Sequence, residues 1–309
     1  MKILSGHRAS GIIFRYIRQY RGCYLLPANV CPIVPLTFKL AGVDFKFVDI
    51  NADSLCIDEQ TCINIVKTGN YAGMVFVHTY GTPYNPQMFF AKLKDISPCF
   101  SIIDDRCLCV PDIIPQETYA DLTLYSTGYA KYVDMGGGGY GFLQDDHSLW
   151  TEHVDYTGYN IENDYKNAFL KKEKIQNVSN GWLDAHVDNF VNESYIQKIY
   201  KLKSEITIHK NKINAIYTDL LESIQTLPHH FNGWRYNILV NNKENILKEI
   251  FKAGLFASSH YQPSSRLFVD NKFPNADYLY NHVINLFNDK YIIENQARKI
   301  AMLICDIVK

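Results

Sequence analysis

The sequence predicts an α/β protein in which a mainly parallel sheet flanked by helices fills the first half, and a smaller α+β lobe forms the C-terminal part. Three observations indicate this fold. Short apolar segments alternate with amphipathic ones as far as Tyr125, the pattern changes after Gly141, and a long amphipathic segment dominates the second half.

The first half contains compact apolar segments of strand length, which are residues 24–26, 45–48, 74–77, 100–103 and 122–125. Between them, residues 33–40, 59–66 and 87–93 repeat apolar side chains at spacings of three and four, as helices do. The last of these follows Asn85 and Pro86, a typical cap and first-turn pair. This alternation favours a doubly wound sheet.

The second half begins with a polar and aromatic stretch, and we divide the chain there into a large α/β domain (residues 1–165) and a second part (residues 166–309). Within the second part, apolar spacing predicts a long helix over residues 193–227. A strand at 236–240, a helix at 244–252 and a terminal helix at 294–308 complete the small lobe.

Composition excludes several classes of protein. The 309 residues include 31 Lys and Arg against 32 Asp and Glu, so the net charge of -1 offers no field for nucleic acid or an anionic membrane. No segment is apolar enough to span a bilayer, and the N-terminus lacks the apolar core of a secretory signal, so we expect a cytoplasmic protein. The eight cysteines lack metal-site spacing, and we predict free thiols and no metal.

Chemically active side chains follow the ends of the predicted strands, where open α/β sheets bind ligands. Asp104 and Asp105 follow one strand; Ser126 follows the next, with Lys131 five residues later, before the glycines at 136–139. Each feature alone could be a turn cap, a surface charge or a flexible loop. Their occurrence at successive strand ends favours a functional site.

These segments resemble the DegT/DnrJ/EryC1/StrS sugar aminotransferases, which are fold-type-I enzymes that use pyridoxal 5'-phosphate. The similarity is carried by residues 102–105, by 125–131 with the glycines at 136–139, and by shorter matches at 5–6, 26–29, 77–81 and 260–263. It covers most of residues 1–145 and becomes sparse in the C-terminal lobe.

The resemblance implies roles for particular residues. Lys131 would hold the cofactor as a Schiff base and then act as acid and base, and Asp105 would keep the ring nitrogen protonated. Residues 5–8 are expected to open the first helix, whose N-terminus would bind the phosphate of the cofactor. Further cofactor contacts would come from Gly6, His7, Ser126 and, toward the neighbouring subunit, Asn160. Substrate contacts are expected from His78, His260 and Tyr261, with a structural role left open for the two histidines.

The expected function is therefore the transfer of an amino group to a keto sugar, nucleotide-linked, with glutamate as donor, in amino-sugar biosynthesis for a surface polysaccharide or a secondary metabolite. We also expect a homodimer.

One alternative is a pyridoxal-phosphate-dependent sugar dehydratase, a branch that tends to replace the lysine with histidine. Another is a shortened, inactive homologue that binds a nucleotide sugar or a partner. The chain starts almost at the Ser-Gly match, Leu108 stands where the family has Gln or His, and Cys31 stands where many relatives have an aromatic residue.

Overall fold

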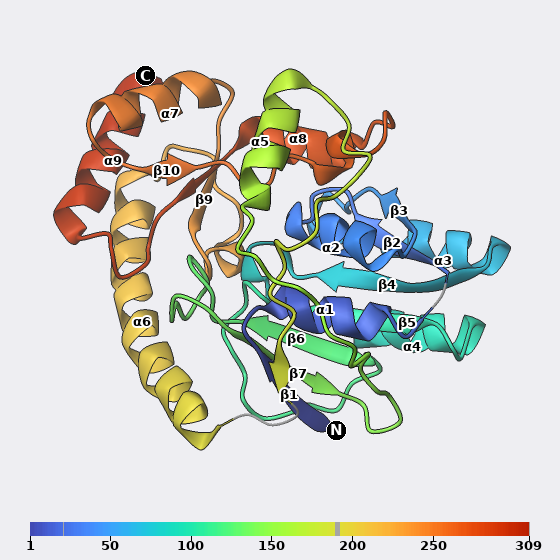
Figure 1. Cartoon of the computed structure of the whole chain (residues 1–309). Helices are drawn as coiled ribbons and strands as arrows, with labels where there is room; N and C mark the ends of the chain where they lie inside the picture. The colour runs from blue at the N-terminus through green and yellow to red at the C-terminus, as the bar shows by residue number, and fades with distance from the viewer. Residues whose placement is uncertain (21, 189–191, 309) are drawn as a thin grey trace.

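The computed structural model describes residues 1–20, 22–188 and 192–308, and over this part of the chain the alternating segments form one large sheet (Figure 1). The described strands of this sheet lie in the order β3-β2-β4-β5-β6-β7-β1-β8. Their bounds are β1 (Lys2–Gly6), β2 (Cys23–Pro27), β3 (Phe45–Val48), β4 (Tyr71–Val77), β5 (Ser101–Asp105), β6 (Leu122–Ser126), β7 (Gly139–Leu143) and β8 (Val187–Asp188). Strands β2 to β6 pair in parallel, and β7, β1 and β8 add antiparallel pairs at one side. The predicted fold class is confirmed.

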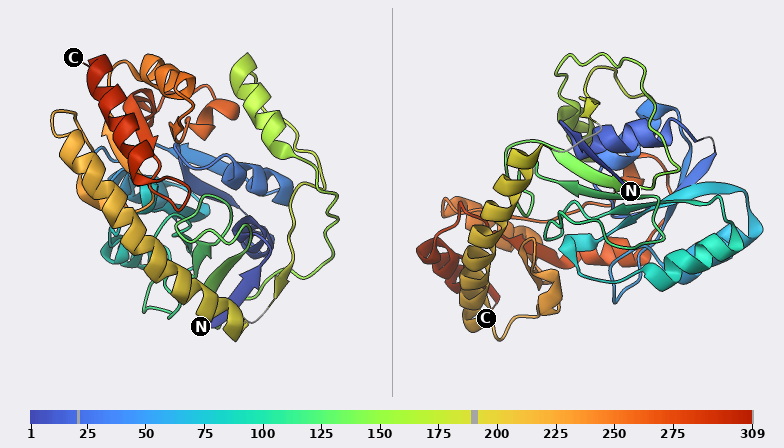
Figure 2. Two further views of the ribbon diagram at one scale, coloured as in Figure 1. Left: turned by 90° about the vertical axis from the view of Figure 1, so that its left-hand side faces the viewer. Right: turned by 90° about the horizontal axis from the view of Figure 1, so that it is seen from below.

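Helices cover both faces of the sheet (Figure 2). On one face lie α1 (Ala9–Ile17) and α2 (Ile33–Ala41), and on the other lie α3 (Glu59–Thr68) and α4 (Gln87–Ile96). Successive side chains of a strand point alternately toward the two layers of helices. Val75 and Ile103 belong to the core with α1 and α2, whereas Met74 and Ile102 belong to the core with α3 and α4. Strands β4 and β5 therefore carry apolar side chains toward both layers of helices.

The start of the chain differs from the prediction. Residues 5–8 were expected to open the first helix, but Ser5 and Gly6 end strand β1, and α1 begins only at Ala9. Strand β7 was also not predicted. Its sequence carries two glycines, which weaken a strand pattern, and pairing on both sides by β6 and β1 forms it nevertheless.

The C-terminal lobe contains a three-stranded antiparallel sheet in the order β10-β11-β9 among the described residues. The elements of the second half are α5 (Ile161–Lys171), α6 (Glu193–Leu220), β9 (Tyr236–Leu239), α7 (Lys243–Lys252), β10 (Ala257–Ser258), α8 (Pro274–His282), β11 (Val283–Leu286) and α9 (Glu294–Val308). Helices α6, α7 and α9 bury their apolar faces against this sheet, with Ile213, Ile238 and Ile300 in the shared core. Helix α6 ends at Leu220, before the predicted 227, because the Leu227 amide donates to the Asn237 carbonyl of β9.

The expected domain division between residues 165 and 166 falls within α5, and β8 beyond it pairs with β1 of the large sheet. The division stays a prediction. In the described part of the chain no helix has the length and apolar character needed to cross a bilayer.

The arrowheads of β4 and β6 point toward the side where α6 and the C-terminal lobe lie, so the carboxyl ends of the parallel strands face that lobe (Figure 1).

Candidate active site

Lys131 lies in a loop after β6 whose backbone is fixed on both sides of the residue. The Asp134 carboxylate accepts hydrogen bonds from the amides of Ala130 (3.0 Å) and Gly136 (2.8 Å). From the small lobe, the Trp234 indole donates to the Ala130 carbonyl at 2.6 Å. No described carboxylate lies within ion-pair distance of the Lys131 amine. The loop therefore presents an unpaired amine on a restrained backbone.

Asp105 ends strand β5 and is 7% exposed. Its Oδ1 accepts a hydrogen bond from the Cys107 amide at 2.9 Å. Burial raises the pKa of the Cys107 thiol well above its usual value; Asp105 adds to this shift and Lys131 opposes it. The charges of Asp105 and Lys131 also act on the Cys31 thiol, and burial raises the pKa of that thiol too. Lys131 and Asp105 thus share one site, and its thiols stay protonated near neutral pH.

A cradle of hydrogen-bond donors lies where α1 meets the glycine segment. Helix α1 begins without a side-chain cap at Arg8. A Cβ on Gly139 would lie 2.6 Å from the Ala9 nitrogen, so only glycine lets the helix start approach β7 this closely. Ser126 pairs with Gly139 in the sheet register. The Ser126 hydroxyl donates to the Gly138 carbonyl oxygen over a long 3.4 Å and accepts from the Gly128 amide at 3.2 Å. The first amides of α1, with the Ser126 hydroxyl once it turns from Gly138, are donors of the kind that bind phosphate.

Gly6 and His7 border this cradle. Gly6 pairs with Gly139, and a Cβ on Gly6 would lie 3.0 Å from the His186 carbonyl oxygen. The His7 amide donates to that same oxygen at 3.2 Å, and its Nδ1 lies 2.8 Å from Asp184 Oδ2. The His7 amide and Nδ1 thus already have partners in the chain.

The small lobe contributes His260 and Tyr261 to the site. Tyr80 donates its hydroxyl to the His260 carbonyl, and the His260 amide donates to Asn285 Oδ1 at 2.7 Å. Burial, followed by the positive charges of Arg235 and Lys131, lowers the pKa of His260 to about 3. Burial raises the pKa of Tyr261 well above its usual value, and Asp105 adds to that shift. A neutral imidazole and a protonated phenol therefore lie within electrostatic range of Lys131 and Asp105 respectively.

His78 lies apart from this set. It is 1% exposed; its Nε2 lies 2.8 Å from Asp104 Oδ1 and its Nδ1 lies 2.9 Å from the Thr82 carbonyl oxygen. Asp104 Oδ2 accepts a hydrogen bond from Arg106 Nε at 2.7 Å. Because both ring nitrogens of His78 have partners, these contacts favour the structural role over a substrate contact.

Asn160 caps helix α5, where its Oδ1 accepts the Glu162 amide at 3.0 Å. Glu162 lies close enough to Cys31 to affect its thiol pKa, and Cys31 in turn acts on Tyr165 of the same helix. The start of α5 therefore lies beside the site of its own chain. The expected contact of Asn160 with a neighbouring subunit stays a prediction.

Solved structures of two aminotransferases and one dehydratase superpose on nearly the whole of this chain. A DegT DnrJ EryC1 StrS aminotransferase from Brucella abortus superposes with a TM-score of 0.70 at 16% identity, over 99% of this chain and 85% of that chain. Helicobacter pylori PseC, an aminotransferase involved in the biosynthesis of pseudoaminic acid, gives 0.69 and 16% over 98% and 86%. E. coli GDP-4-keto-6-deoxy-D-mannose-3-dehydratase with bound hydrated PLP gives 0.66 and 14% over 97% and 87%.

The chain has the fold of these enzymes. No protein-family model and no curated protein matches its sequence. At such identities the likeness establishes the fold alone.

The buried Asp104 carboxylate stabilises the folded protein through its contacts with His78 and Arg106. Burial alone would raise the pKa of Asp104, but His78 and Arg106 lower it below its usual value. Asp104→Asn leaves these partners without their counter-charge, so we expect a loss of about 3 kcal/mol in the free energy of unfolding, measured with urea at pH 7. Asp95→Asn, at an exposed position, should cost far less.

The same substitution has a defined pH dependence. A carboxyl whose pKa is lower in the folded state stabilises the protein above its unfolded pKa and loses this effect as pH falls through the folded pKa. The difference between wild type and Asp104→Asn should therefore stay constant above about pH 4 and shrink below it. Equal stability of the two proteins at pH 7 would contradict this account.

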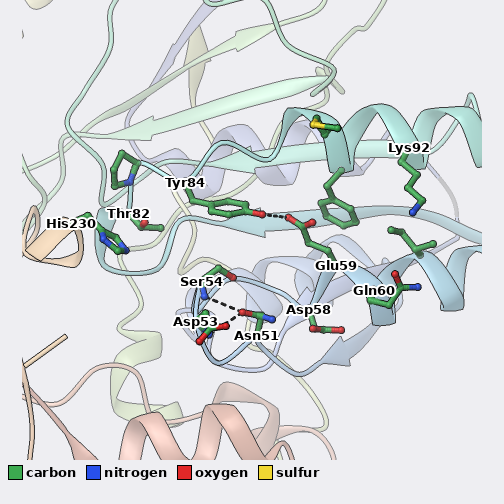
Figure 3. Close-up of a pocket in the computed structure, with 14 residues that line it drawn as sticks. Asn51, Asp53, Ser54, Asp58, Glu59, Gln60, Thr82, Tyr84, Lys92 and His230 are labelled. Atoms are coloured by element: carbon green, nitrogen blue, oxygen red, sulfur yellow. Dashed lines mark hydrogen bonds between the residues drawn. The ribbon is translucent and has the colours of Figure 1, made fainter. Parts of the chain in front are cut away.

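A cavity of about 810 Å³ lies at the carboxyl ends of β3 and β4 (Figure 3). Its wall combines carboxylates such as Asp58 with apolar side chains such as Phe89. Within the wall, Tyr84 donates its hydroxyl to Glu59 Oε1 at 2.7 Å. None of the site residues expected from the sequence lines this cavity. Lys131 instead lines a cavity of about 230 Å³ between its loop and α6.

Two residues at the site were not predicted from the sequence. Trp234 donates to Ala130 and stacks with Tyr80 and Tyr261, at interplanar angles of 7° and 10°. Arg235 follows it and is buried. This dipeptide directly precedes strand β9 and carries no motif, and only the packing of the two lobes brings it to the loop of Lys131.

Proposed function

We propose that this chain is a pyridoxal-phosphate-dependent aminotransferase that transfers an amino group to a keto sugar. The observation that carries this proposal is the unpaired Lys131 amine on its restrained loop, whose charge acts on the same two buried thiols, Cys31 and Cys107, as that of the buried Asp105 carboxylate. Likeness of fold to sugar aminotransferases supports the choice of reaction and substrate class.

The residues fit the cofactor. The uncapped start of α1, close to Ser126 across Gly139, offers amide and hydroxyl donors for a phosphate. Asp105 offers a buried carboxylate that would favour a protonated ring nitrogen. Neighbours with this fold have been solved with PLP or in a PMP form. When bound, pyridoxal phosphate supplies an aldehyde for covalent attachment and a ring that takes up electrons.

The chain's own groups divide the remaining work. Lys131 supplies the amine for attachment and then holds or releases the proton that moves during transfer. Its neighbour His260 is neutral, so it can accept or donate a hydrogen bond without adding positive charge. Asp105 would hold the protonated ring nitrogen of the cofactor, and Tyr261, on which the charge of Asp105 acts, stays a protonated phenol. The Trp234–Ala130 hydrogen bond keeps the lysine loop against the small lobe.

We further propose glutamate as amino donor and a nucleotide-linked keto sugar as acceptor, in a cytoplasmic pathway of amino-sugar biosynthesis. Support for the sugar comes from fold likeness to PseC of Helicobacter pylori, which acts in the biosynthesis of pseudoaminic acid.

A homodimer is proposed as well. Large apolar side chains such as Met88 (90% exposed) and Ile114 (60% exposed) offer surface that a second copy could cover.

The experiment is a half-reaction. The purified protein is loaded with pyridoxal phosphate, and its visible absorbance band is recorded before and after L-glutamate is added. We expect the band to disappear while 2-oxoglutarate forms in an amount equal to the enzyme, because the amino group moves to the cofactor. Adding nucleotide keto sugars, followed by mass spectrometry, identifies the acceptor. A band that glutamate and other amino acids leave unchanged would contradict aminotransfer and favour the dehydratase, whereas a protein without any band would favour an inactive binding protein.

A further inference from the structure

Arg235 is a buried cation without a counter-ion. The residue is 5% exposed, and among the residues that the structure describes no carboxylate lies within 4.0 Å of its guanidinium. The charge of Asp289 acts on Arg235 from farther away, while Asp289 Oδ1 accepts the Tyr291 amide at 3.0 Å. Burying a charge is costly unless it is paired and hydrogen-bonded. The position therefore calls for an anion that the chain itself does not supply.

The contacts of Arg235 hold its guanidinium but leave part of its edge free. Its central carbon lies 3.8 Å from the centre of the Phe287 ring and 4.2 Å from that of Trp234. Nη1 donates to the Ser258 hydroxyl. Nε and Nη2 have no described protein acceptor, and neither is among the fully buried atoms that lack a partner. Because these two groups form a planar fork with the geometry of a carboxylate or phosphate, this edge is suited to an oxyanion.

The free edge belongs to the neighbourhood of Lys131. His260 lies close enough to both Arg235 and Lys131 for their charges to act on it. Trp234, whose ring packs on Arg235, donates through its indole to the carbonyl of the residue before Lys131. A substrate bound beside Lys131 would thus come near a second, fixed positive charge from the small lobe.

We propose that Arg235 binds an oxyanion of the substrate in this site. This inference rests on the proposed function, because its ligand would be either the carboxylate of the amino donor or a phosphate of the nucleotide-linked sugar. Both present two oxygens in a plane to the Nε and Nη2 edge. The two sources are separated by the experiment.

The test measures anion binding to pyridoxal-phosphate-loaded protein by calorimetry, with 2-oxoglutarate and with UDP as probes. Arg235→Leu removes the charge, and Arg235→Lys keeps the charge but removes the planar fork. Arg266→Leu is the matched control, because Arg266 is a more exposed arginine of the same lobe that is paired with Asp277. Circular dichroism and the cofactor band are recorded for every variant, so a failure of the proposed function appears as a missing band.

We expect the Kd of one of the two anions to rise by about 10- to 100-fold in Arg235→Leu, and by a smaller factor in Arg235→Lys. Weakened binding of 2-oxoglutarate alone assigns the donor carboxylate, and weakened binding of UDP alone assigns the phosphate. If Arg235→Leu does not fold, the Lys variant decides by the same comparison. Unchanged affinities in a folded variant that keeps the cofactor band would overturn the proposal, as would a loaded wild-type protein that binds neither anion.

Discussion

Lys131→Ala is expected to abolish transamination and the visible absorbance band of the loaded protein together, since one amine both attaches the cofactor and moves the proton. Proton transfer by a positioned group contributes about 10²- to 10⁴-fold to a rate, so we expect at least this loss in kcat for the glutamate half-reaction, measured by stopped-flow absorbance. Lys131→Arg should fail equally, because a guanidinium retains the charge but cannot form the attachment.

Lys201→Ala, at an exposed position of α6, is the matched control and should leave both the band and the rate unchanged. The fold should survive in Lys131→Ala, because the loop is held by Asp134 and Trp234 through backbone atoms and not by the lysine side chain. A Lys131→Ala protein with a normal rate would mean that another lysine performs the reaction.

Asp105→Asn is expected to have the second largest effect. The substitution keeps the size of the side chain and an oxygen for the Cys107 amide, but it removes the negative charge that would favour a protonated ring nitrogen. We expect kcat to fall by about 100- to 1,000-fold, a loss comparable to that of one preorganised electrostatic group. The melting temperature should change little.

The neighbouring residue on the same strand provides the control for this prediction. Asp104→Asn should lower the melting temperature through its effect on His78 and Arg106, while the absorbance band of the loaded protein is kept. If Asp105→Asn instead loses stability and keeps its rate, Asp105 has a structural role only.

The fold could be predicted because its central strands and helices carry local signals. Residues 74–77 and 100–103 are apolar throughout, since helices cover both of their faces, and residues 59–66 and 87–93 show helical spacing. Strand β7 was missed because its glycines hide the strand pattern, and these glycines are needed for the close approach of α1. The start of the first helix was misplaced because Ser5 resembles a cap.

The site was predictable only where it depends on strand ends. Asp105 ends β5 and Lys131 lies five residues after the end of β6, and the order of a parallel sheet brings such ends together. Trp234 and Arg235 lie about a hundred residues farther along the chain from Lys131, and no local pattern marks them. Likewise, nothing in the sequence showed that both ring nitrogens of His78 would be taken by Asp104 and the Thr82 carbonyl.

Borohydride reduction of the wild-type protein loaded with pyridoxal phosphate, followed by digestion and mass spectrometry, tests the central claim most directly. Reduction converts the bond between the amine and the cofactor into a stable one, so the attachment site keeps a measurable mass. The account predicts one modified peptide per chain, with the added mass on Lys131. Modification of a different lysine, or no modified peptide from protein that shows the visible band, would contradict it.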